Sequence, residues 1–155
     1  MEINQLLEMD NVHLLQSFVQ SNHRVLETLD EDGNNLLILA FKKNSSDEVI
    51  QFLASEIDPN IGNEVGITPL FIAIQKGRQN WVENFIELGI SPSETERESG
   101  FTPLMEAIVS YQDDIAKLLL EKGVEKNVRD RHGLTALDYA RKMRRNDLIE
   151  LLSQN

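Results

Sequence analysis

Apolar residues in this sequence recur in short blocks with helical spacing, separated by polar breaks. In residues 97–127, three apolar positions at the spacing i, i+3, i+4 are followed, after a polar break, by three more at the same spacing: Leu104, Ala107 and Ile108, then Ile115, Leu118 and Leu119. This spacing places side chains on one face of a helix. The pattern therefore predicts a short helix followed by a second helix, each with one buried face.

The residues that flank these blocks are typical helix boundaries. Gly100 suits a tight turn that needs a positive φ, and Thr102 can cap a helix through its hydroxyl group. Pro103 stands at the first helical position, where a missing N–H does no harm, and Gly123 ends the second helix in the favoured C-terminal position. The unit is thus a turn, a first helix, a second helix and a closing glycine.

The same unit occurs four times in the chain. Its turn glycines are Gly33, Gly66, Gly100 and Gly133, which stand 33, 34 and 33 residues apart. The second unit repeats the pattern closely, whereas the first has Asn35 in place of the threonine and lacks the proline. A period near 33 predicts a stack of helical repeats rather than one globular core.

With Gly-x-Thr-Pro-Leu, a downstream Ala, an apolar second helix and a closing Gly in register, the chain resembles the ankyrin-repeat family. The resemblance implies an all-α solenoid, an L-shaped stack of helix pairs with β-hairpin fingers on one side. We expect one domain over residues 1–155: an N-terminal capping helix pair (1–29), repeat 1 (30–62), repeat 2 (63–96), repeat 3 (97–129) and a C-terminal capping repeat (130–155).

Several positions depart from the family pattern. No unit has His after Thr-Pro-Leu, and Ile38, Phe71, Met105 and Asp138 stand there instead, so we expect apolar packing between the middle units. Tyr111 stands where Gly77 ends the equivalent helix, which indicates either an altered turn or a functional side chain. The last unit is more polar, as expected for a capping repeat with one face unpartnered. Residues 93–99 form a longer, acidic finger.

The net charge of −11 is concentrated in residues 1–100, with 17 acidic and 6 basic side chains, against nine of each in residues 101–155. This indicates either an acidic, soluble surface or an acidic flank that steers a basic partner. Nucleic acid is not expected as a partner because its backbone requires a basic stripe. The one basic cluster is small and terminal: Arg141, Lys142, Arg144 and Arg145.

The sequence offers little for catalysis or for cofactors. It has no cysteine, and its three histidines have no metal-ligand spacing to one another or to a carboxylate. Residues 30–33 resemble a calcium loop superficially but lack the alternating oxygen ligands and distal glutamate. We expect no cofactor, no metal and no enzymatic activity. The longest apolar run, residues 36–41, is too short to cross a membrane, and the N-terminus has no leader, so we expect a cytoplasmic monomer.

The leading hypothesis is a protein–protein interaction module that grips a folded partner through its fingers and first helices. Phe101 and Tyr111 are the expected anchors, since large side chains usually supply most interface energy. The finger residues could instead pack against neighbouring fingers, and Trp81 is expected in the core. The resemblance places the partner-binding residues at finger and helix-end positions: Glu64, Val65, Ile67, Gln75, Lys76, Glu98, Phe101, Val109, Ser110, Tyr111, Arg131, His132, Leu134 and Lys142.

Three alternatives remain open at this point. The chain could be a small acidic inhibitor or immunity protein that neutralises a basic toxin or enzyme, with residues 94–98 and Glu64 facing it. It could be a structural unit that self-assembles through the ends of the stack. An enzyme would need a pocket with converging polar groups, to which nothing in the sequence points.

Overall fold

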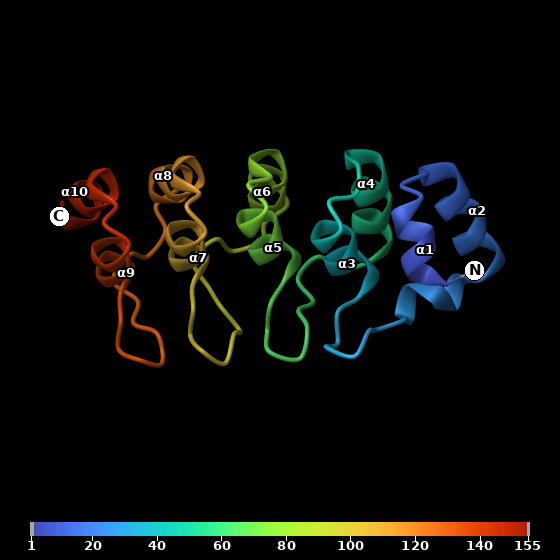
Figure 1. Cartoon of the computed structure of the whole chain (residues 1–155), viewed down its shortest axis with the longest axis horizontal. Coiled ribbons are helices and arrows are strands. Elements are labelled where there is room, and N and C mark those ends of the chain that lie inside the picture. Colours follow the sequence, from blue (N-terminus) through green and yellow to red (C-terminus); the bar gives the residue numbers. More distant parts are fainter. Residues whose placement is uncertain (1, 155) are drawn as a thin grey trace. The chain divides into compact units, whose positions relative to one another are not determined.

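The computed structural model describes residues 2–154, which form ten α-helices, one 3₁₀-helix and no strand (Figure 1). The chain divides into two compact units, residues 1–72 and residues 73–155, with the boundary inside helix α5. We refer to them as the N-terminal unit and the C-terminal unit. In each repeat we call the loop before the first helix the finger, and the first helix the inner helix.

The N-terminal unit contains α1 (Ile3–Glu8), α2 (Val12–Ser21), the 3₁₀-helix η1 (His23–Glu27), α3 (Leu36–Lys42), α4 (Asp47–Glu56) and the start of α5 (Pro69–Gln75). Its core is mostly aliphatic, with two phenylalanines, and includes Leu6, Leu15, Val19, Ile38, Phe41, Ile50, Leu53 and Phe71. Two polar contacts link the first two helix pairs: Lys43 pairs with Glu8 at 3.1 Å, and Ser46 N donates to Asp10 Oδ1. The first and second fingers are linked by Asn63 Nδ2, which donates to Asn34 Oδ1.

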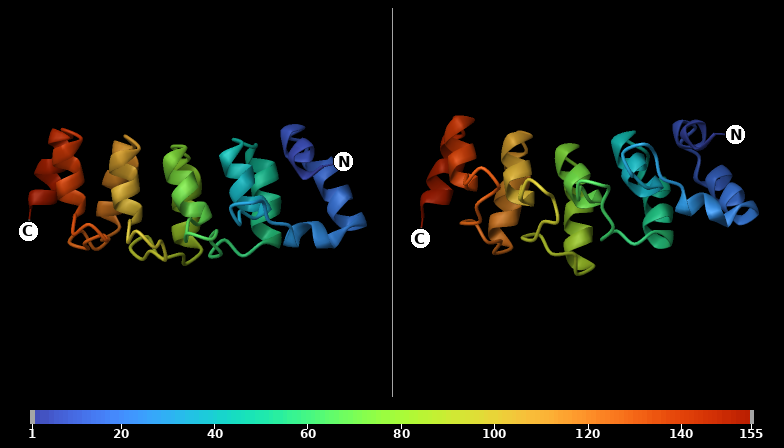
Figure 2. Two further views of the ribbon diagram at one scale, coloured as in Figure 1. Left: turned by 60° about the horizontal axis from the view of Figure 1, so that its bottom comes forward. Right: turned by 90° about the horizontal axis from the view of Figure 1, so that it is seen from below.

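The C-terminal unit contains the end of α5, then α6 (Gln79–Glu87), α7 (Pro103–Val109), α8 (Asp113–Glu121), α9 (Ala136–Lys142) and α10 (Asn146–Ser153). The inner helices α7 and α9 pack against each other, and each also packs against the second helix of its own repeat. Figure 2 shows these two helix pairs side by side, each with its finger on the same side. Trp81 is 7% exposed and lies 5.6 Å from the Phe85 ring, which confirms its expected place in the core.

The helix starts follow the threonine caps that the sequence predicts. Thr102 Oγ1 accepts from Met105 N at 3.2 Å, and Pro103 is the first residue of α7. Thr135 Oγ1 accepts from Asp138 N, and the Asp138 carboxylate accepts in return from Thr135. These bonds satisfy N–H groups that a helix start leaves without an intrahelical partner. At the three inner positions without His, apolar packing is confirmed, since Ile38, Phe71 and Met105 are at most 2% exposed.

The fingers are narrow turns, with backbone hydrogen bonds but no strand within residues 2–154. In the fourth finger, Asp130 N donates to Leu134 O at 2.9 Å. The third and fourth fingers lie against each other, since Arg131 N donates to Ser99 O at 2.8 Å. A side chain at Gly100 would meet the Asp130 backbone at 3.2 Å, so this close approach, together with a φ of +71°, favours glycine.

No helix within residues 2–154 combines the length and the apolar character that crossing a membrane would require.

Candidate protein-binding surface

The third finger lacks the polar side chain that holds the other three fingers. Three residues before the turn glycine, the other fingers have Asp30, Asn63 or Asp130, whose Oδ1 accepts from two backbone amides at 2.9–3.2 Å. The third finger has Arg97 at this position. Because an arginine side chain cannot accept a hydrogen bond, it cannot make this turn.

Two hydroxyl groups hold the third finger instead. Thr95 Oγ1 accepts from Arg97 N at 3.2 Å and donates to Phe101 O at 2.7 Å, while Ser99 Oγ accepts from Phe101 N at 3.2 Å. The longer acidic finger thus keeps its turn by other means. The Arg97 side chain contacts other groups of the repeat.

Arg97 extends across the start of the inner helix. Its guanidinium lies 4.9 Å from the centroid of the Phe101 ring, and Nη1 is 3.8 Å from Glu106 Oε1 on α7. An arginine over an aromatic face contributes about 0.5–1 kcal/mol at an exposed site and more when water is excluded. Arg97 therefore links the aromatic ring of the finger to a carboxylate of the inner helix.

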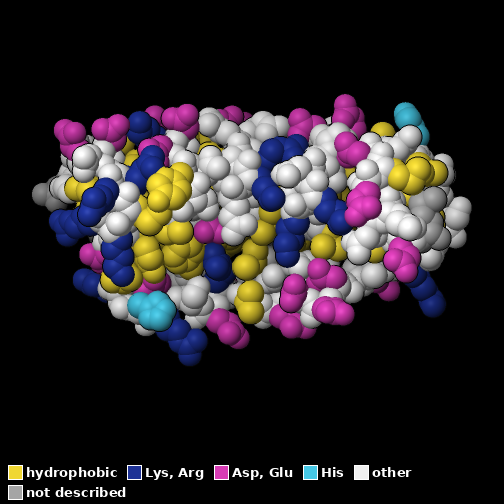
Figure 3. Space-filling view, viewed as in Figure 1, with side chains coloured by type: hydrophobic (Ala, Val, Ile, Leu, Met, Phe, Trp, Pro, Cys, Tyr) yellow, Lys and Arg dark blue, Asp and Glu magenta, His cyan; other side chains and the backbone are white. Residues whose placement is uncertain are grey.

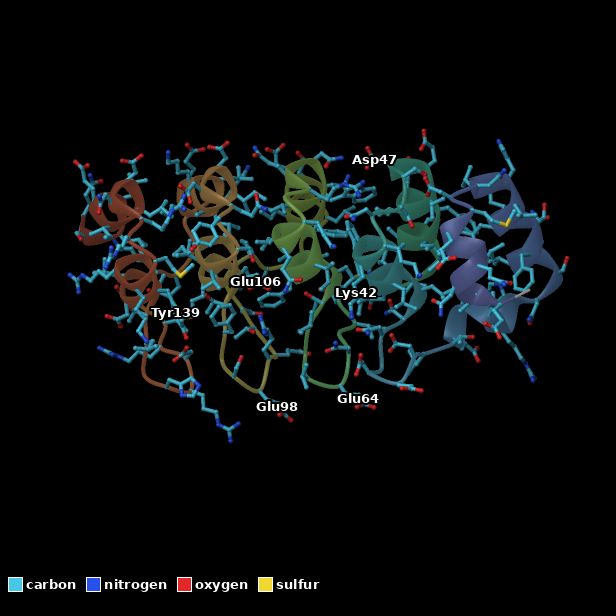
Figure 4. All side chains as sticks on the ribbon, viewed as in Figure 1. Lys42, Asp47, Glu64, Glu98, Glu106 and Tyr139 are labelled. Atoms are coloured by element: carbon cyan, nitrogen blue, oxygen red, sulfur yellow. The ribbon has the colours of Figure 1, made fainter. Side chains whose placement is uncertain are left out.

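Glu106 is a buried carboxylate in the middle of this surface, 5% exposed on α7. Burial raises its pKa above the ordinary value of 4.5, although the amide of Gln75 donates to it and the charge of Arg97 opposes the rise. In Figure 4, Glu106 lies on the inner helix α7 and Tyr139 lies on the neighbouring inner helix α9. The Glu106 carboxyl group is thus held in place by Gln75 and Arg97.

Tyr139 joins the third and fourth repeats. Its ring meets Phe101 edge to face, with centroids 5.3 Å apart and an interplanar angle of 86°. Its hydroxyl donates to Asp130, and burial together with this carboxylate raises the pKa of Tyr139 to about 12. Burial alone would raise the pKa of Asp130, but hydrogen bonds from Tyr139 and from the amides of Leu134 and His132 outweigh it and lower that pKa.

Tyr111 keeps the left-handed turn that glycine makes in the second repeat. Its φ is +58°, against +67° for Gly77, and Gln112 N donates to Ala107 O just as Arg78 N donates to Ala73 O. The turn is therefore not altered. A non-glycine residue held in this region is strained by about 1–3 kcal/mol.

The Tyr111 side chain lies on the surface, 59% exposed, with the Arg145 guanidinium 4.8 Å from its ring centroid. Arg145 also pairs with Asp113 at the start of α8. Tyr111 thus presents one ring face to Arg145 and leaves much of the ring in contact with water. Such an exposed, oriented aromatic ring is typical of binding surfaces.

We call the following set the C-terminal face: Arg97, Phe101, Glu106, Val109, Ser110, Tyr111, Arg131, His132, Tyr139, Lys142 and Arg145. Its members lie on the third and fourth fingers, on α7 and α9 and on the turns that follow these helices. Figure 3 shows hydrophobic side chains gathered over α7 and α9, with Lys and Arg side chains beside them over α9 and the fourth finger.

The other predicted site residues are distributed as follows. Gln75 is bonded to Glu106, and Lys76 is exposed at the end of α5. Glu98 is exposed on the third finger, and Leu134 is half-buried at the base of the fourth finger. Glu64, Val65 and Ile67 belong to the N-terminal unit, where Val65 is 47% exposed and Ile67 is half-buried.

Sequence reasoning missed four members of the face: Arg97, Glu106, Tyr139 and Arg145. A signal for Arg97 was present, because aligning the four turn glycines places it in the column of Asp30, Asn63 and Asp130. For Glu106 the burial on an inner helix could not be read from its residue type. Tyr139 was not predicted as a site residue, and an aromatic residue on a predicted inner helix is usually a core residue.

A cavity of about 940 Å³ lies outside this face, between α8, α10 and the loop after α8. It is lined by four carboxylates and two lysines around a few aliphatic side chains, among them Leu120 and Leu151. Its charges are mixed and none of the groups identified above reaches it, so we do not assign it to the binding surface.

The sequence matches the family described as ankyrin repeats (3 copies) over residues 5–96 and 91–155. These matches span nearly the whole chain, and the geometry of caps, turns and helix pairs agrees with them. The chain belongs to the ankyrin-repeat family.

Similar curated proteins come from several eukaryotes. The chain is 35% identical over 70% of its length to the mouse (Mus musculus) ankyrin repeat and SAM domain-containing protein 6, of which it covers 13%. It is 24% identical over 96% of its length to the human (Homo sapiens) neurogenic locus notch homolog protein 1, of which it covers 6%. It is 30% identical over 52% of its length to protein HOS4 of Saccharomyces cerevisiae, covering 7%.

The chain therefore spans only a small part of the curated relatives that it matches, from 6% to 35% of their length. The likeness concerns the repeats. Ankyrin repeats are in general protein–protein interaction modules, and this coarse role applies to the chain through its family.

Proposed function

We propose that this protein binds a folded protein partner through the C-terminal face, without catalysing a reaction. The fingers and inner helices of the third and fourth repeats form a continuous surface with an aromatic centre and a charged edge. This role extends the general one of the family to particular residues.

One observation carries the proposal. This chain has Arg97 at the finger position where the other three repeats have Asp or Asn, and it has Tyr111 at a left-handed turn position where the second repeat has glycine. Both side chains lie on the C-terminal face, and both contact another member of it. Departures from the local rule of a fold are expected at functional sites, where strain is accepted in exchange for function.

The face has the composition of an interface hot spot. Aromatic and arginine side chains carry most binding energy when they sit at the centre of a well-packed patch. Here Phe101 and Tyr139 are held edge to face, and Arg97 and Arg145 each lie over a ring. Side chains fixed in this way lose little further freedom on binding, which favours affinity.

The test is affinity capture from the source cells with wild-type protein and the double variant Phe101→Ala, Tyr111→Ala. We expect the variant to keep its helical circular dichroism and to lose most of the captured partner. The control is Leu88→Ala, which removes a 64% exposed apolar side chain at the end of α6 and should leave capture unchanged. Equal capture by the wild-type protein and the double variant would remove this face from the proposal.

A second candidate is the acidic inhibitor, which the charge distribution favours. Glu94, Glu96 and Glu98 are all exposed on the third finger, and residues 1–100 carry most of the negative charge. In this version the partner is basic and is steered by exposed carboxylates. Binding would then weaken steeply with ionic strength, because charges at this exposure are screened within about 10 Å at 0.1 M salt. A salt-independent affinity would argue against it.

A further inference from the structure

The fourth repeat is the one strongly cationic part of an acidic chain. Residues 128–145 contain six Lys and Arg side chains and only two aspartates, Asp130 and Asp138. Both aspartates are engaged within the repeat: Asp130 holds the finger turn and accepts from Tyr139, and Asp138 caps α9 with Thr135. Their pKa values are lowered accordingly. They stay charged at neutral pH, but their oxygens are turned to internal donors.

The cations of this repeat are not all engaged in the same way. Arg129 donates to Gly133 O at 2.7 Å, and Arg145 pairs with Asp113. By contrast, Arg131 on the fourth finger and Lys142 at the end of α9 are exposed and form no ion pair within residues 2–154. They stand at opposite ends of the inner helix, one before it and one at its last residue. Two cationic groups therefore border the face on its α9 side.

The aromatic centre lies beside these cations. Phe101 and Tyr139 form the edge-to-face pair, and Tyr111 exposes its ring in the turn that follows α7. The third finger carries three exposed glutamates, and Glu106 is buried on α7. Thus the charge changes sign across the face, from acidic at the third finger to basic at α9.

From this arrangement we infer that the partner presents an acidic protein segment, with carboxylates placed around an apolar side chain, to α9 and the fourth finger. The apolar side chain meets Phe101 and Tyr139, and the carboxylates meet Arg131 and Lys142. The inference rests on the proposed function and names the chemistry of its partner. It is opposite in sign to the basic partner of the acidic inhibitor.

A nucleic acid fits this surface poorly, although it also carries negative charge. A phosphate backbone has a charge at every nucleotide, and along this face it would meet Glu106 and the glutamates of the third finger. Its binding would also depend on many cations in a row, whereas the exposed cations of this repeat are divided between the fourth finger (Arg131) and the end of α9 with the turn after it (Arg141, Lys142 and Arg144). A few carboxylates around an apolar side chain match a surface with exposed cations on the fourth finger and at the end of α9 and with the ring pair of Phe101 and Tyr139.

The experiment is a titration of the ¹⁵N-labelled full chain with three decapeptides, followed by heteronuclear NMR. One peptide alternates Glu with Leu and Phe, the second has Lys in place of every Glu, and the third has Ser in place of every Leu and Phe. Poly-uridylate RNA is the fourth probe. We expect the first peptide to shift the signals of Phe101, Arg131, Tyr139 and Lys142 at the lowest concentration.

The decisive variant is Arg131→Glu, Lys142→Glu. Reversing two rim charges should weaken binding of the Glu-Leu-Phe peptide on the order of tenfold, since two attractive exposed pairs become repulsive. The control is Arg24→Glu, Lys122→Glu, which changes the net charge equally at exposed positions outside the face. Its affinity for the Glu-Leu-Phe peptide should lie within about twofold of that of the wild type.

Each other outcome contradicts the inference in a distinct way. Preference for the Lys peptide at the same signals would overturn the acidic partner and leave the proposed function standing. Equal binding of RNA or of the Ser peptide would mean attraction to any polyanion. If no peptide shifts the signals of the face, the inference fails, and the capture experiment with Phe101→Ala, Tyr111→Ala decides the proposed function separately.

Discussion

The third finger differs from the fourth in what holds its turn, although the two lie side by side. In the fourth finger Asp130 accepts from two amides and from Tyr139, so the side chain at this position is structural. In the third finger Arg97 faces the inner helix, and Thr95 and Ser99 hold the turn. The comparison teaches that one repeat position can hold the turn in one copy and contact the inner helix in the next, where the proposed function assigns it to binding.

Removing Asp130 should have the largest effect on stability. In Asp130→Ala, two finger amides and the Tyr139 hydroxyl lose their acceptor, and unsatisfied groups of this kind destabilise a protein by about 2–3 kcal/mol. Arg97→Ala, at the same position of the third finger, should lower the free energy of unfolding by less than Asp130→Ala does, because it removes the ring contact and the ion pair with Glu106 but leaves the hydrogen bonds of the turn in place. Urea unfolding of the two variants measures this contrast, and equal losses would erase the distinction between the fingers.

The pH dependence of the Asp130 effect has a definite sign. Because its folded pKa lies below the ordinary value of 3.8, its contribution is present above that pH and is lost as the pH falls through the folded pKa. The difference in free energy of unfolding between wild type and Asp130→Ala should therefore become smaller in acid. A difference that grows below pH 3.8 would contradict the assignment.

The turn after the inner helix allows a second comparison. Arg144 has the same left-handed conformation as Tyr111, with φ of +54° against +58°, but its side chain makes no ring contact within residues 2–154. Arg144→Gly should raise the free energy of unfolding by about 1 kcal/mol, because glycine adopts this conformation without strain. Tyr111→Gly should gain less, since it also loses a contact with Arg145 that contributes about 0.5–1 kcal/mol.

Thermal and urea unfolding can separate these two cases. If Tyr111→Gly lowered stability by more than about 1 kcal/mol, Tyr111 would be a structural residue and its strain would need no functional explanation. A small change in stability with a large loss of partner capture is the result that we expect.

The smallest effect concerns Glu106. Burial raises its pKa above 4.5, so the contribution of this carboxyl group to stability is present below that pH and is lost as the pH rises through the folded pKa. Relative to Glu106→Gln, the wild type should therefore lose stability between pH 4.5 and neutral pH. Glu98→Gln, on the exposed third finger, is the matched control for the loss of one carboxylate. If the free energy of unfolding of the wild type rose relative to that of Glu106→Gln with increasing pH, the assigned sign would be wrong.

The sequence predicted most of the fold because the repeat is encoded locally. The turn glycines, the Thr-Pro starts and the apolar faces each specify their own part of the unit, and the helices appear where these signals lie. Apolar packing at Ile38, Phe71 and Met105 followed in the same way from the absence of His.

The candidate site was predicted only in part. Phe101, Tyr111 and the finger positions follow from their place in the repeat, which can be counted along the chain. The partners that give these residues their roles cannot be counted in that way. The stacking of Arg97 on Phe101, the edge contact of Tyr139 and the burial of Glu106 depend on which repeats lie side by side and on the rotamers of their side chains.

The central claim, that Arg97 occupies a structural position for the sake of binding, is tested most directly by Arg97→Asn. Asn63 already makes this turn in the second finger, so the new amide oxygen can accept from the amides of Ser99 and Phe101. Unfolding in urea and the affinity for the captured partner should be measured on the same preparation. We predict equal or higher stability together with weaker binding. Unchanged affinity, or a loss of stability as large as the loss of binding, would contradict the account.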